Sequence, residues 1–296
     1  MKKKAVFYGA ATAIITPFSE GSIDYATLGN IIEMQIKANI SALVIGGTTG
    51  ESATLTNEER YALFEFVKEK VAGRVKLIFG TGTNDTALTL KHTRAAERVG
   101  CDGVLVVTPY YNKGTEEGLI RHYERIAQAT YLPIILYNVP TRTGVNISLS
   151  ALERLCRHEN IVAIKEASDS ADRLVEVAAF GEELMLYAGA DSQTYTALSL
   201  GGGGVISVIS NLYPRLSALI CEKFFSDDKE ESLRLQLKAL PLIRAMFCET
   251  NPAPIKYAMH RLGLCENELR LPLCEVSEKS ARLIDGEIKK AEDFFR

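Results

Sequence analysis

Short apolar runs alternate with longer amphipathic stretches over most of the chain, from Tyr8 to Phe225. The apolar runs are nearly continuous and do not alternate between apolar and polar positions, which is typical of parallel strands buried on both faces. The pattern predicts eight strands: Tyr8–Ile15, Ala42–Gly46, Lys76–Gly80, Gly103–Thr108, Pro133–Val139, Ile161–Lys165, Leu184–Gly189 and Gly204–Val208.

The amphipathic stretches between these runs predict helices. The clearest is Asn57–Val71, whose apolar residues recur on one face at helical spacing. Thr56 and Glu59 have the spacing of a capping box at its start. Residues 86–99 and 115–130 follow the same helical pattern, and each ends shortly before a glycine or a proline.

Eight strands separated by helices predict an α/β fold, a (β/α)8 TIM barrel. We expect residues 1–225 to form this barrel as the catalytic domain, with Pro214–Phe225 as its last helix. Residues 226–296 show no further strand pattern and predict a C-terminal helical region. Its longest helices are expected at Ser232–Phe247 and Val276–Phe294.

The segment Pro252-Ala253-Pro254 is expected to break the chain between these two helices. The C-terminal region is small for an independent domain, so we expect it to pack on the barrel or on another subunit.

The composition is ordinary for a globular protein, with 47% hydrophobic and 24% charged residues. The net charge is −3, and no dense basic face follows Lys2-Lys3-Lys4, so neither nucleic acid nor a membrane is expected as a partner. Ala5–Ile15 has the outline of a secretory signal, but no cleavage site follows, and we interpret it as a buried first strand. No other run approaches the ~18 apolar residues of a membrane span.

The six cysteines include no Cys-x-x-Cys pair, and several lie in apolar segments. The spacing of His260, Cys265 and Cys274 matches no zinc site. We therefore expect structural, reduced cysteines, no metal, and a cytoplasmic protein.

Lys165 ends an otherwise apolar strand. In an α/β barrel the reactive groups lie at the C-terminal ends of the strands. Burial disfavours the ammonium form of such an amine and leaves more of it nucleophilic. Glu166 should point to the opposite side of the strand. The alternative is that Lys165 is an ordinary lysine that extends to solvent from a strand end.

The second predicted strand runs into Gly46-Gly47-Thr48-Thr49-Gly50-Glu51-Ser52. Small residues let the backbone approach a ligand, and successive amides with two hydroxyls suit a carboxylate. A tight turn without a ligand is the alternative, and neither common phosphate-loop motif is present.

Two further strand ends carry candidate residues. Tyr137 is expected beside Lys165 on the neighbouring strand, where a phenol can relay protons, although buried tyrosines are often structural. Arg142 follows in the next loop and could bind a carboxylate with its planar fork, or be simply exposed. Tyr110 and Tyr111 follow the fourth strand, and paired aromatics also suit an interface.

With these motifs, the chain resembles the dihydrodipicolinate synthase family, also called 4-hydroxy-tetrahydrodipicolinate synthase, of the N-acetylneuraminate lyase superfamily. The resemblance runs essentially end to end and includes Asn251-Pro252-x-Pro254-x-Lys256. It rests on Gly47-Thr48-Thr49-Gly50-Glu51, Tyr110-Tyr111-Asn112, Tyr137-Asn138-Val139-Pro140-x-Arg142-Thr143-Gly144, Ile164-Lys165-Glu166 and Gly204-Val205-Ile206-Ser207.

The resemblance implies a lyase of the class I aldolase type in lysine and diaminopimelate biosynthesis, in which Lys165 forms a Schiff base with pyruvate. Tyr137, Thr48 and Tyr111 would form a proton relay, with Tyr111 of the partner subunit completing it. A homo-oligomer follows, at least a dimer, and the family is usually a tetramer. Because the protonated imine serves as the electron sink, no cofactor is needed.

The same resemblance implies the binding residues. Thr49 would hold the pyruvate carboxylate, with Gly189 and Ile206 lining the pyruvate pocket. Arg142 would bind the carboxylate of the second substrate, L-aspartate 4-semialdehyde. After aldol addition, the amino group of that substrate would displace Lys165 by cyclisation.

Two alternatives remain. Another pyruvate-dependent aldolase, such as a sialic acid or keto-deoxy-sugar lyase, shares several motifs, but sialic acid lyases lack the Pro-x-Arg-Thr-Gly sequence that contains Arg142. A barrel that has lost catalysis is disfavoured because all the expected catalytic residues are present together.

The sequence departs from lysine-inhibited family members at the effector pocket. Ser52, Ala53, Asn84 and Tyr110 match that pocket, whereas its two histidines and its glutamate are replaced here by Asn57, Arg60 and Leu88. Leu88 cannot accept the lysine ammonium and Arg60 would repel it, so weak or absent feedback inhibition by L-lysine is expected.

Overall fold

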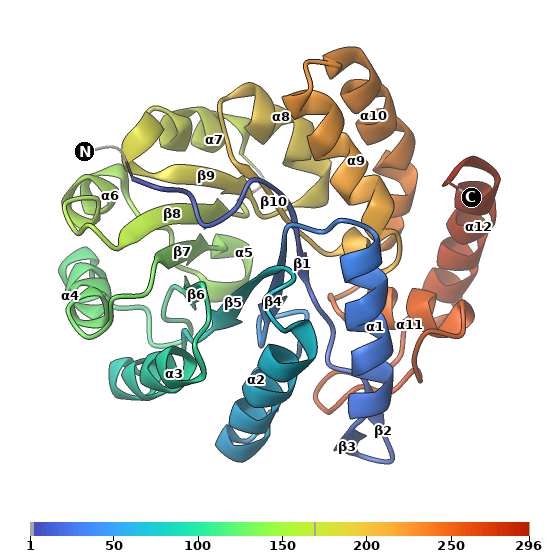
Figure 1. The fold of residues 1–296 in the computed structure, drawn as a ribbon, viewed down its shortest axis with the longest axis horizontal. Coiled ribbons are helices and arrows are strands. Elements are labelled where there is room, and N and C mark those ends of the chain that lie inside the picture. The colour runs from blue at the N-terminus through green and yellow to red at the C-terminus, as the bar shows by residue number, and fades with distance from the viewer. Residues whose placement is uncertain (1–2, 169, 296) are drawn as a thin grey trace.

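Eight parallel strands close into a barrel at the centre of the protein (Figure 1). The structure is a computed structural model that describes residues 3–168 and 170–295. Around the barrel the strands follow the order of the sequence, and the last pairs with the first. They are β1 (Gly9–Ala13), β4 (Ala42–Ile45), β5 (Lys76–Gly80), β6 (Gly103–Val107), β7 (Ile134–Asn138), β8 (Ile161–Glu166), β9 (Met185–Ala188) and β10 (Gly204–Ser207).

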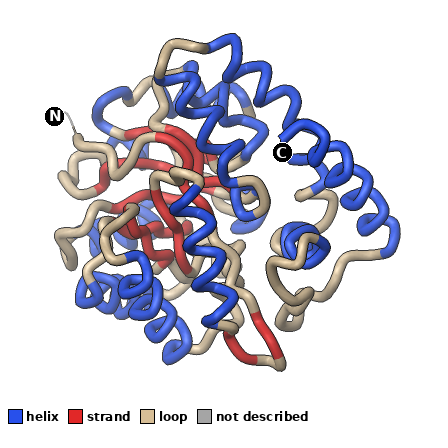
Figure 2. The backbone as a smooth tube through the Cα atoms, turned by 45° about the vertical axis from the view of Figure 1, so that its right-hand side comes forward, coloured by secondary structure: helices blue, strands red, loops and turns tan. Residues whose placement is uncertain are grey.

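Helices surround the barrel, and those that follow the strands return the chain to the N-terminal end of the sheet (Figures 1 and 2). The helices of the barrel are α1 (Tyr25–Lys37), α2 (Asn57–Val71), α3 (Thr86–Val99), α4 (Glu116–Ala127), α5 (Pro140–Thr143), α6 (Leu149–Leu155), α7 (Ala171–Ala178), α8 (Thr194–Ser199) and α9 (Pro214–Phe225). A small antiparallel hairpin, β2 (Phe18–Ser19) and β3 (Ser22–Ile23), lies apart from the barrel at the periphery (Figure 2).

The C-terminal region contains α10 (Lys229–Ala245), α11 (Ala253–Arg261) and α12 (Glu278–Phe295). α10 packs along α9 and α8, and α12 packs on α10 and α11. Buried apolar residues of α10 and α11, such as Leu242 and Ile255, belong to the same continuous core as the outer faces of the strands. The C-terminal helices therefore continue the outer layer of the barrel on one side (Figure 1).

The barrel interior is a second, smaller core of inward-facing side chains. Alanines such as Ala11 and Ala163 lie among larger residues, which lets side chains from opposite strands meet at the axis. Toward the N-terminal end, Phe7 stacks on Tyr187 with ring centroids 4.3 Å apart, and the Tyr187 hydroxyl donates to the Phe7 carbonyl. Because that end is filled, a ligand can enter only from the C-terminal ends of the strands.

The predicted (β/α)8 barrel with a helical C-terminal extension is confirmed. All eight predicted strands are present, and most are one or two residues shorter than the apolar runs. α2, α3 and α9 begin and end at the predicted residues. None of the helices in the described part of the chain combines the length and apolar character needed to cross a bilayer.

The proline segment 252–254 lies between α10 and α12, as predicted, and it also begins a further helix. It does not only interrupt the chain, because α11 begins at Ala253 with Pro254 in its first turn. A proline is tolerated there because the first amides of a helix have no intrahelical acceptor. Pro252 occupies the N-cap position, without a side-chain hydrogen bond to the helix. Asn251 therefore lies two residues before the start of α11.

The capping box of α2 forms as predicted. The Thr56 hydroxyl accepts from the Glu59 amide at 3.1 Å, and the Glu59 carboxylate accepts from the Thr56 amide at 2.9 Å. Glu59 also forms a two-pronged ion pair with Arg270 of the C-terminal region. The start of α2 is therefore fixed by its own capping box and by an ion pair with the C-terminal region.

We predict that Thr56→Ala lowers the free energy of unfolding by about 1 kcal/mol, because it removes one half of the capping box. Urea denaturation at fixed protein concentration measures this change. Thr56→Ser, which keeps the hydroxyl, is the matched control and should unfold near the wild-type midpoint. Equal stability of Thr56→Ala and the wild-type chain would contradict the prediction.

Candidate active site

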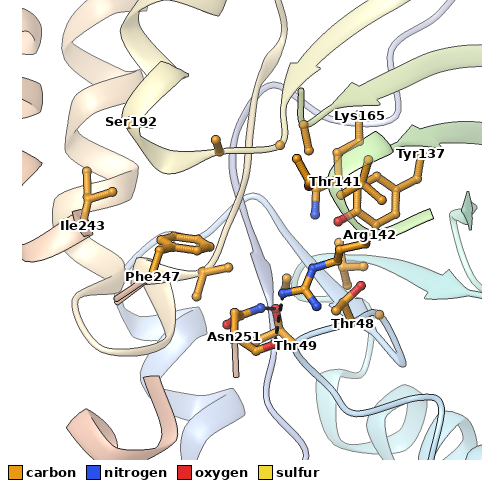
Figure 3. A pocket seen from close by; sticks show the side chains of 18 of the residues that line it. Thr48, Thr49, Tyr137, Thr141, Arg142, Lys165, Ser192, Ile243, Phe247 and Asn251 are labelled. Carbon is orange, nitrogen blue, oxygen red and sulfur yellow. Dashed lines mark hydrogen bonds between the residues drawn. The ribbon is translucent and has the colours of Figure 1, made fainter. Parts of the chain in front are cut away.

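A cavity of about 400 Å³ opens at the C-terminal ends of the strands, between the barrel and α10 (Figure 3). Its floor is formed by the top layer of inward-facing barrel residues, and its outer wall by the C-terminal region. It is lined by Ala13, Val44, Gly47, Thr48, Thr49, Leu105, Tyr137, Val139, Thr141, Arg142, Lys165, Ala167, Gly189, Ala190, Ser192, Val208, Leu240, Ile243, Arg244, Phe247 and Asn251.

Lys165 and Tyr137 lie side by side in this cavity on adjacent strands (Figure 3). The register of β7 and β8 pairs the two residues directly, and Lys165 Nζ lies 4.3 Å from the centroid of the Tyr137 ring. Both are buried, with 5% of Lys165 and 7% of Tyr137 exposed. The amine is thus fixed against an aromatic face, while the phenol is held close enough to share a small ligand with it.

Glu166 points away from the cavity, as expected from the alternation along a strand. Its carboxylate accepts two contacts from the Asn138 side-chain amide, at 2.9 and 3.0 Å. It also lies 3.3 Å from Arg173 of α7. Glu166 therefore joins β7, β8 and α7 behind the site and is not a counter-ion for Lys165.

The loop after β4 brings Thr48 and Thr49 to the cavity. Gly46 turns the chain with φ of +66°, a conformation that favours glycine. The Gly50 amide then donates to the Gly47 carbonyl at 3.1 Å, which makes the loop compact. Thr49 is 3% exposed, and its hydroxyl accepts from the Asn251 side-chain amide at 2.9 Å (Figure 3).

Arg142 lies on the short helix α5, directly after β7. Its guanidinium donates one hydrogen bond, from Nη2 to the Asn251 carbonyl at 3.1 Å. Within the described residues it forms no ion pair, so most of its N–H groups are available to a ligand. The same residue, Asn251, therefore contacts both Thr49 and Arg142 (Figure 3).

The charge of the lining is one-sided. Lys165, Arg142 and Arg244 contribute three cationic groups, and none of the described lining residues is acidic. Such a cavity attracts anions and fits a ligand that carries more than one carboxylate.

Of three further residues expected at the site, Gly189 lines the cavity, whereas Ile206 and Tyr111 do not. Gly189 lines the cavity, and a Cβ there would lie 2.5 Å from the Ala167 Cβ, so only glycine fits. Ile206 is fully buried in the barrel interior, one layer below Val208, which lines the cavity in its place. Tyr111 is 89% exposed and does not line the cavity of its own chain.

Sequence reasoning assigned no role to Asn251, Ser192, Arg244 or Phe247, all of which line the cavity. Asn251 stood in a recognised motif, but nothing local indicates that its side chain reaches Thr49. Arg244 and Phe247 come from α10 and the turn after it, and their periodicity is that of any amphipathic helix.

Asp191 is a buried carboxylate that shapes the rim beside this cavity. It accepts from the Val208 and Ile209 amides at 2.9 and 3.2 Å and so holds the turn that follows β10. Burial raises the pKa of the Asp191 carboxyl, while these amides and the nearby Lys165 oppose the rise.

The described residues contain no group of three or more His, Cys, Asp or Glu side chains arranged to hold a metal ion. All six cysteines are free thiols. The side chains that line the cavity offer a buried amine, a phenol, the hydroxyls of three threonines and one serine, the Asn251 amide and arginine donors.

A TIM barrel with a buried lysine at the C-terminal end of a strand, beside a tyrosine and carboxylate-binding groups, defines an enzyme of the Schiff-base lyase class. The model of the dihydrodipicolinate synthetase family matches residues 6–291. The chain belongs to this family.

Relatives agree over nearly the whole chain. The chain is 45% identical to the 4-hydroxy-tetrahydrodipicolinate synthase of Alkaliphilus oremlandii, over 96% of this chain and 99% of that protein. It is 46% identical to the enzyme of that name from Geobacter sulfurreducens, over 92% and 94%. The crystal structure of dihydrodipicolinate synthase from Thermotoga maritima superposes with a TM-score of 0.95 at 42% identity, covering 97% of this chain and 99% of that one.

Proposed function

We propose that this chain catalyses the 4-hydroxy-tetrahydrodipicolinate synthase reaction, in which pyruvate condenses with L-aspartate 4-semialdehyde and the product cyclises. This is the first committed step of the diaminopimelate and lysine pathway. The single observation that carries the proposal is the buried Lys165 amine, 4.3 Å from the Tyr137 ring in a cavity with no acidic lining residue among those described. The names of the relatives support the same activity.

The reaction begins when Lys165 Nζ attacks the keto carbon of pyruvate and water leaves, which gives a protonated imine. Thr49 and the compact loop around it hold the pyruvate carboxylate. That loop and Lys165 of β8 line the same cavity. The positive imine then makes the pyruvate methyl group acidic, and loss of a proton gives an enamine.

The protons move through Tyr137, Thr48 and Tyr111 of the partner subunit. Tyr137 is the member beside the amine, and Thr48 also lines the cavity. Tyr111 is exposed in its own chain, with a φ of +71°, as a residue that enters a neighbouring site would be. Positioned acid–base groups of this kind contribute roughly 10²- to 10⁴-fold to a rate.

The enamine carbon adds to the aldehyde of the second substrate, whose carboxylate is bound by Arg142. The free N–H groups of Arg142 at the cavity wall support this role. The amino group of the adduct finally attacks the imine carbon, which forms the ring and releases Lys165. Gly189 leaves room for the substrate at the end of β9, and Ile206 supports the floor from below.

We further propose a homo-oligomer, at least a dimer through Tyr111 and a tetramer as in the family, in the cytoplasm. We also propose that the chain divides into a catalytic barrel, residues 1–225, and a C-terminal helical region, residues 226–296. The shared apolar core supports a region that packs on the barrel and does not fold alone.

We predict a borohydride-stable pyruvate adduct on Lys165. Incubation with pyruvate and borohydride, followed by peptide mapping, should place the added mass on this residue alone. Lys165→Met, which keeps the length and removes the amine, is the matched control and should acquire no adduct. An unmodified Lys165 in the wild-type chain would defeat every Schiff-base aldolase function.

We predict that Arg142→Ala abolishes most turnover of L-aspartate 4-semialdehyde but retains the pyruvate adduct, because Arg142 binds only the second substrate. A loss of two charge-assisted hydrogen bonds corresponds to roughly 10²-fold or more in kcat/KM. Arg142→Lys, which keeps the charge but not the fork, should recover only part of the activity. Equal loss of adduct formation and turnover would count against the assignment.

We predict weak or absent inhibition by L-lysine. Arg60 is 5% exposed, and its guanidinium is fixed by hydrogen bonds to the Gly80 and Ser52 carbonyls. A fixed cation at this position repels a second ammonium group, and Leu88 offers no acceptor. Initial rates measured with increasing lysine test this, and inhibition at sub-millimolar lysine would show the prediction to be wrong.

A further inference from the structure

A buried ion pair joins the functional loop to the C-terminal region. Glu51 directly follows Thr48-Thr49-Gly50, and its carboxylate contacts the Lys256 ammonium of α11. Both side chains are fully buried. The loop is therefore tied, next to two cavity-lining residues, to a segment about 200 positions away in the chain.

The other contacts of the pair also come from the tail and from one aromatic ring. Glu51 Oε2 accepts from the Arg270 amide at 3.1 Å, and Lys256 Nζ donates to the Glu268 carbonyl at 2.8 Å. The Lys256 ammonium lies 4.2 Å from the centroid of Phe18. Each charge thus has a second polar contact, which is what a buried ion pair needs to be tolerated.

This arrangement is not what stability alone would favour. Burial lowers the pKa of the Lys256 ammonium, and the Glu51 carboxylate opposes that shift. Removing two charges from water is costly, and apolar residues of similar size often replace such a pair without loss of stability. Unlike an apolar contact, the ion pair fixes both the distance and the relative direction of the loop that carries Glu51 and the helix that carries Lys256.

The segment that supplies Lys256 also contacts the other side of the loop. Asn251 stands just before α11 and donates to the Thr49 hydroxyl at 2.9 Å. The Lys256 amide donates to the Pro252 carbonyl at 3.0 Å, so both side chains belong to one rigid turn. Within the loop, the Glu51 amide donates to the Thr48 carbonyl at 3.0 Å. A displacement of Glu51 would therefore also displace Thr48.

We propose that Glu51 and Lys256 are positioning residues that fix Thr48 and Thr49 for pyruvate binding. Neither touches the substrate, and the loop between β4 and α2 is held by Asn251 at Thr49 and by Lys256 at Glu51. The inference rests on the proposed role of Thr49 as the seat of the pyruvate carboxylate. Lys165 and Tyr137 stand on β8 and β7, and the contacts of the pair described above involve neither strand, so the chemical steps should be affected less than pyruvate binding.

The test is the double variant Glu51→Gln/Lys256→Met, which removes both charges at nearly constant volume. Its melting temperature should stay near that of the wild-type chain. The pyruvate concentration that half-saturates borohydride trapping of Lys165, and the KM for pyruvate, should each rise about tenfold, because small displacements of binding groups have effects of this size. At saturating pyruvate, kcat should change by less than about threefold.

A stable double variant with wild-type pyruvate saturation would overturn the proposal. Glu51→Asp decides the question if the double variant does not fold, since it keeps the charge and draws it back by one methylene. It should also raise the KM for pyruvate, and an unchanged KM would again overturn the proposal.

Arg270→Met is the matched control. It removes another charge pair between the C-terminal region and α2, with Glu59, together with hydrogen bonds to the Thr54 and Gly21 carbonyls, and leaves the Glu51 and Lys256 side chains intact. Its pyruvate saturation should equal that of the wild-type chain, and a rise as large as in the double variant would mean general loosening of the tail and contradict the proposal. If the wild-type chain itself forms no pyruvate adduct, the proposed function fails, whereas a normal wild-type adduct with unaffected variants defeats this inference alone.

Discussion

The parallel pairing of β7 with β8 is the interaction on which the site depends. Its register places Tyr137 directly opposite Lys165, and both face the barrel axis. In a closed parallel sheet, all strands end on the same side, so residues from distant parts of the chain converge there. A slip of one residue would turn Lys165 toward the helices and Glu166 toward the cavity, which would replace the amine of the site by a carboxylate.

Burial then gives these residues their chemical character. The N-terminal end of the barrel is filled by Phe7 stacked on Tyr187, which leaves one entrance to the cavity. Two carboxylates close to the site, Glu166 and Asp191, are engaged with backbone amides, and Glu166 also with Arg173, behind the lining. The protein thus keeps its negative charges out of a cavity that must bind acidic molecules, and Lys165 has no counter-ion among the described residues that line it.

Much of the fold and of the site could be predicted from the sequence, because the spacing of apolar residues along the chain indicates which segments are buried. Continuous apolar runs identified the eight strands, and the rule that reactive groups follow strand ends identified Lys165, Tyr137, Thr48, Thr49 and Arg142. The layer of an inward-facing residue was harder to assign: Ile206 lies within β10 in the barrel interior, whereas Val208, just past the end of β10, lines the cavity. Asn251 and Arg244 could not be predicted, since their positions depend on how the tail crosses the barrel. The role proposed for Tyr111 would likewise depend on a neighbouring chain, which the pattern of one chain does not describe.

The tail also explains why a loop can serve as a binding site at all. The segment Gly46–Ser52 belongs to no helix or strand, and loops of this kind lose conformational entropy when they bind a ligand. Here that entropy is already lost on folding, because Asn251 holds Thr49 and the Glu51–Lys256 pair holds the end of the turn. Arg142 donates to the Asn251 carbonyl, so Arg142 and Thr49, the groups proposed to bind the two substrates, both contact one residue of the C-terminal region. The barrel supplies the amine and the phenol, and the C-terminal region fixes Thr49 and Arg142, the groups proposed to bind the substrate carboxylates, relative to them.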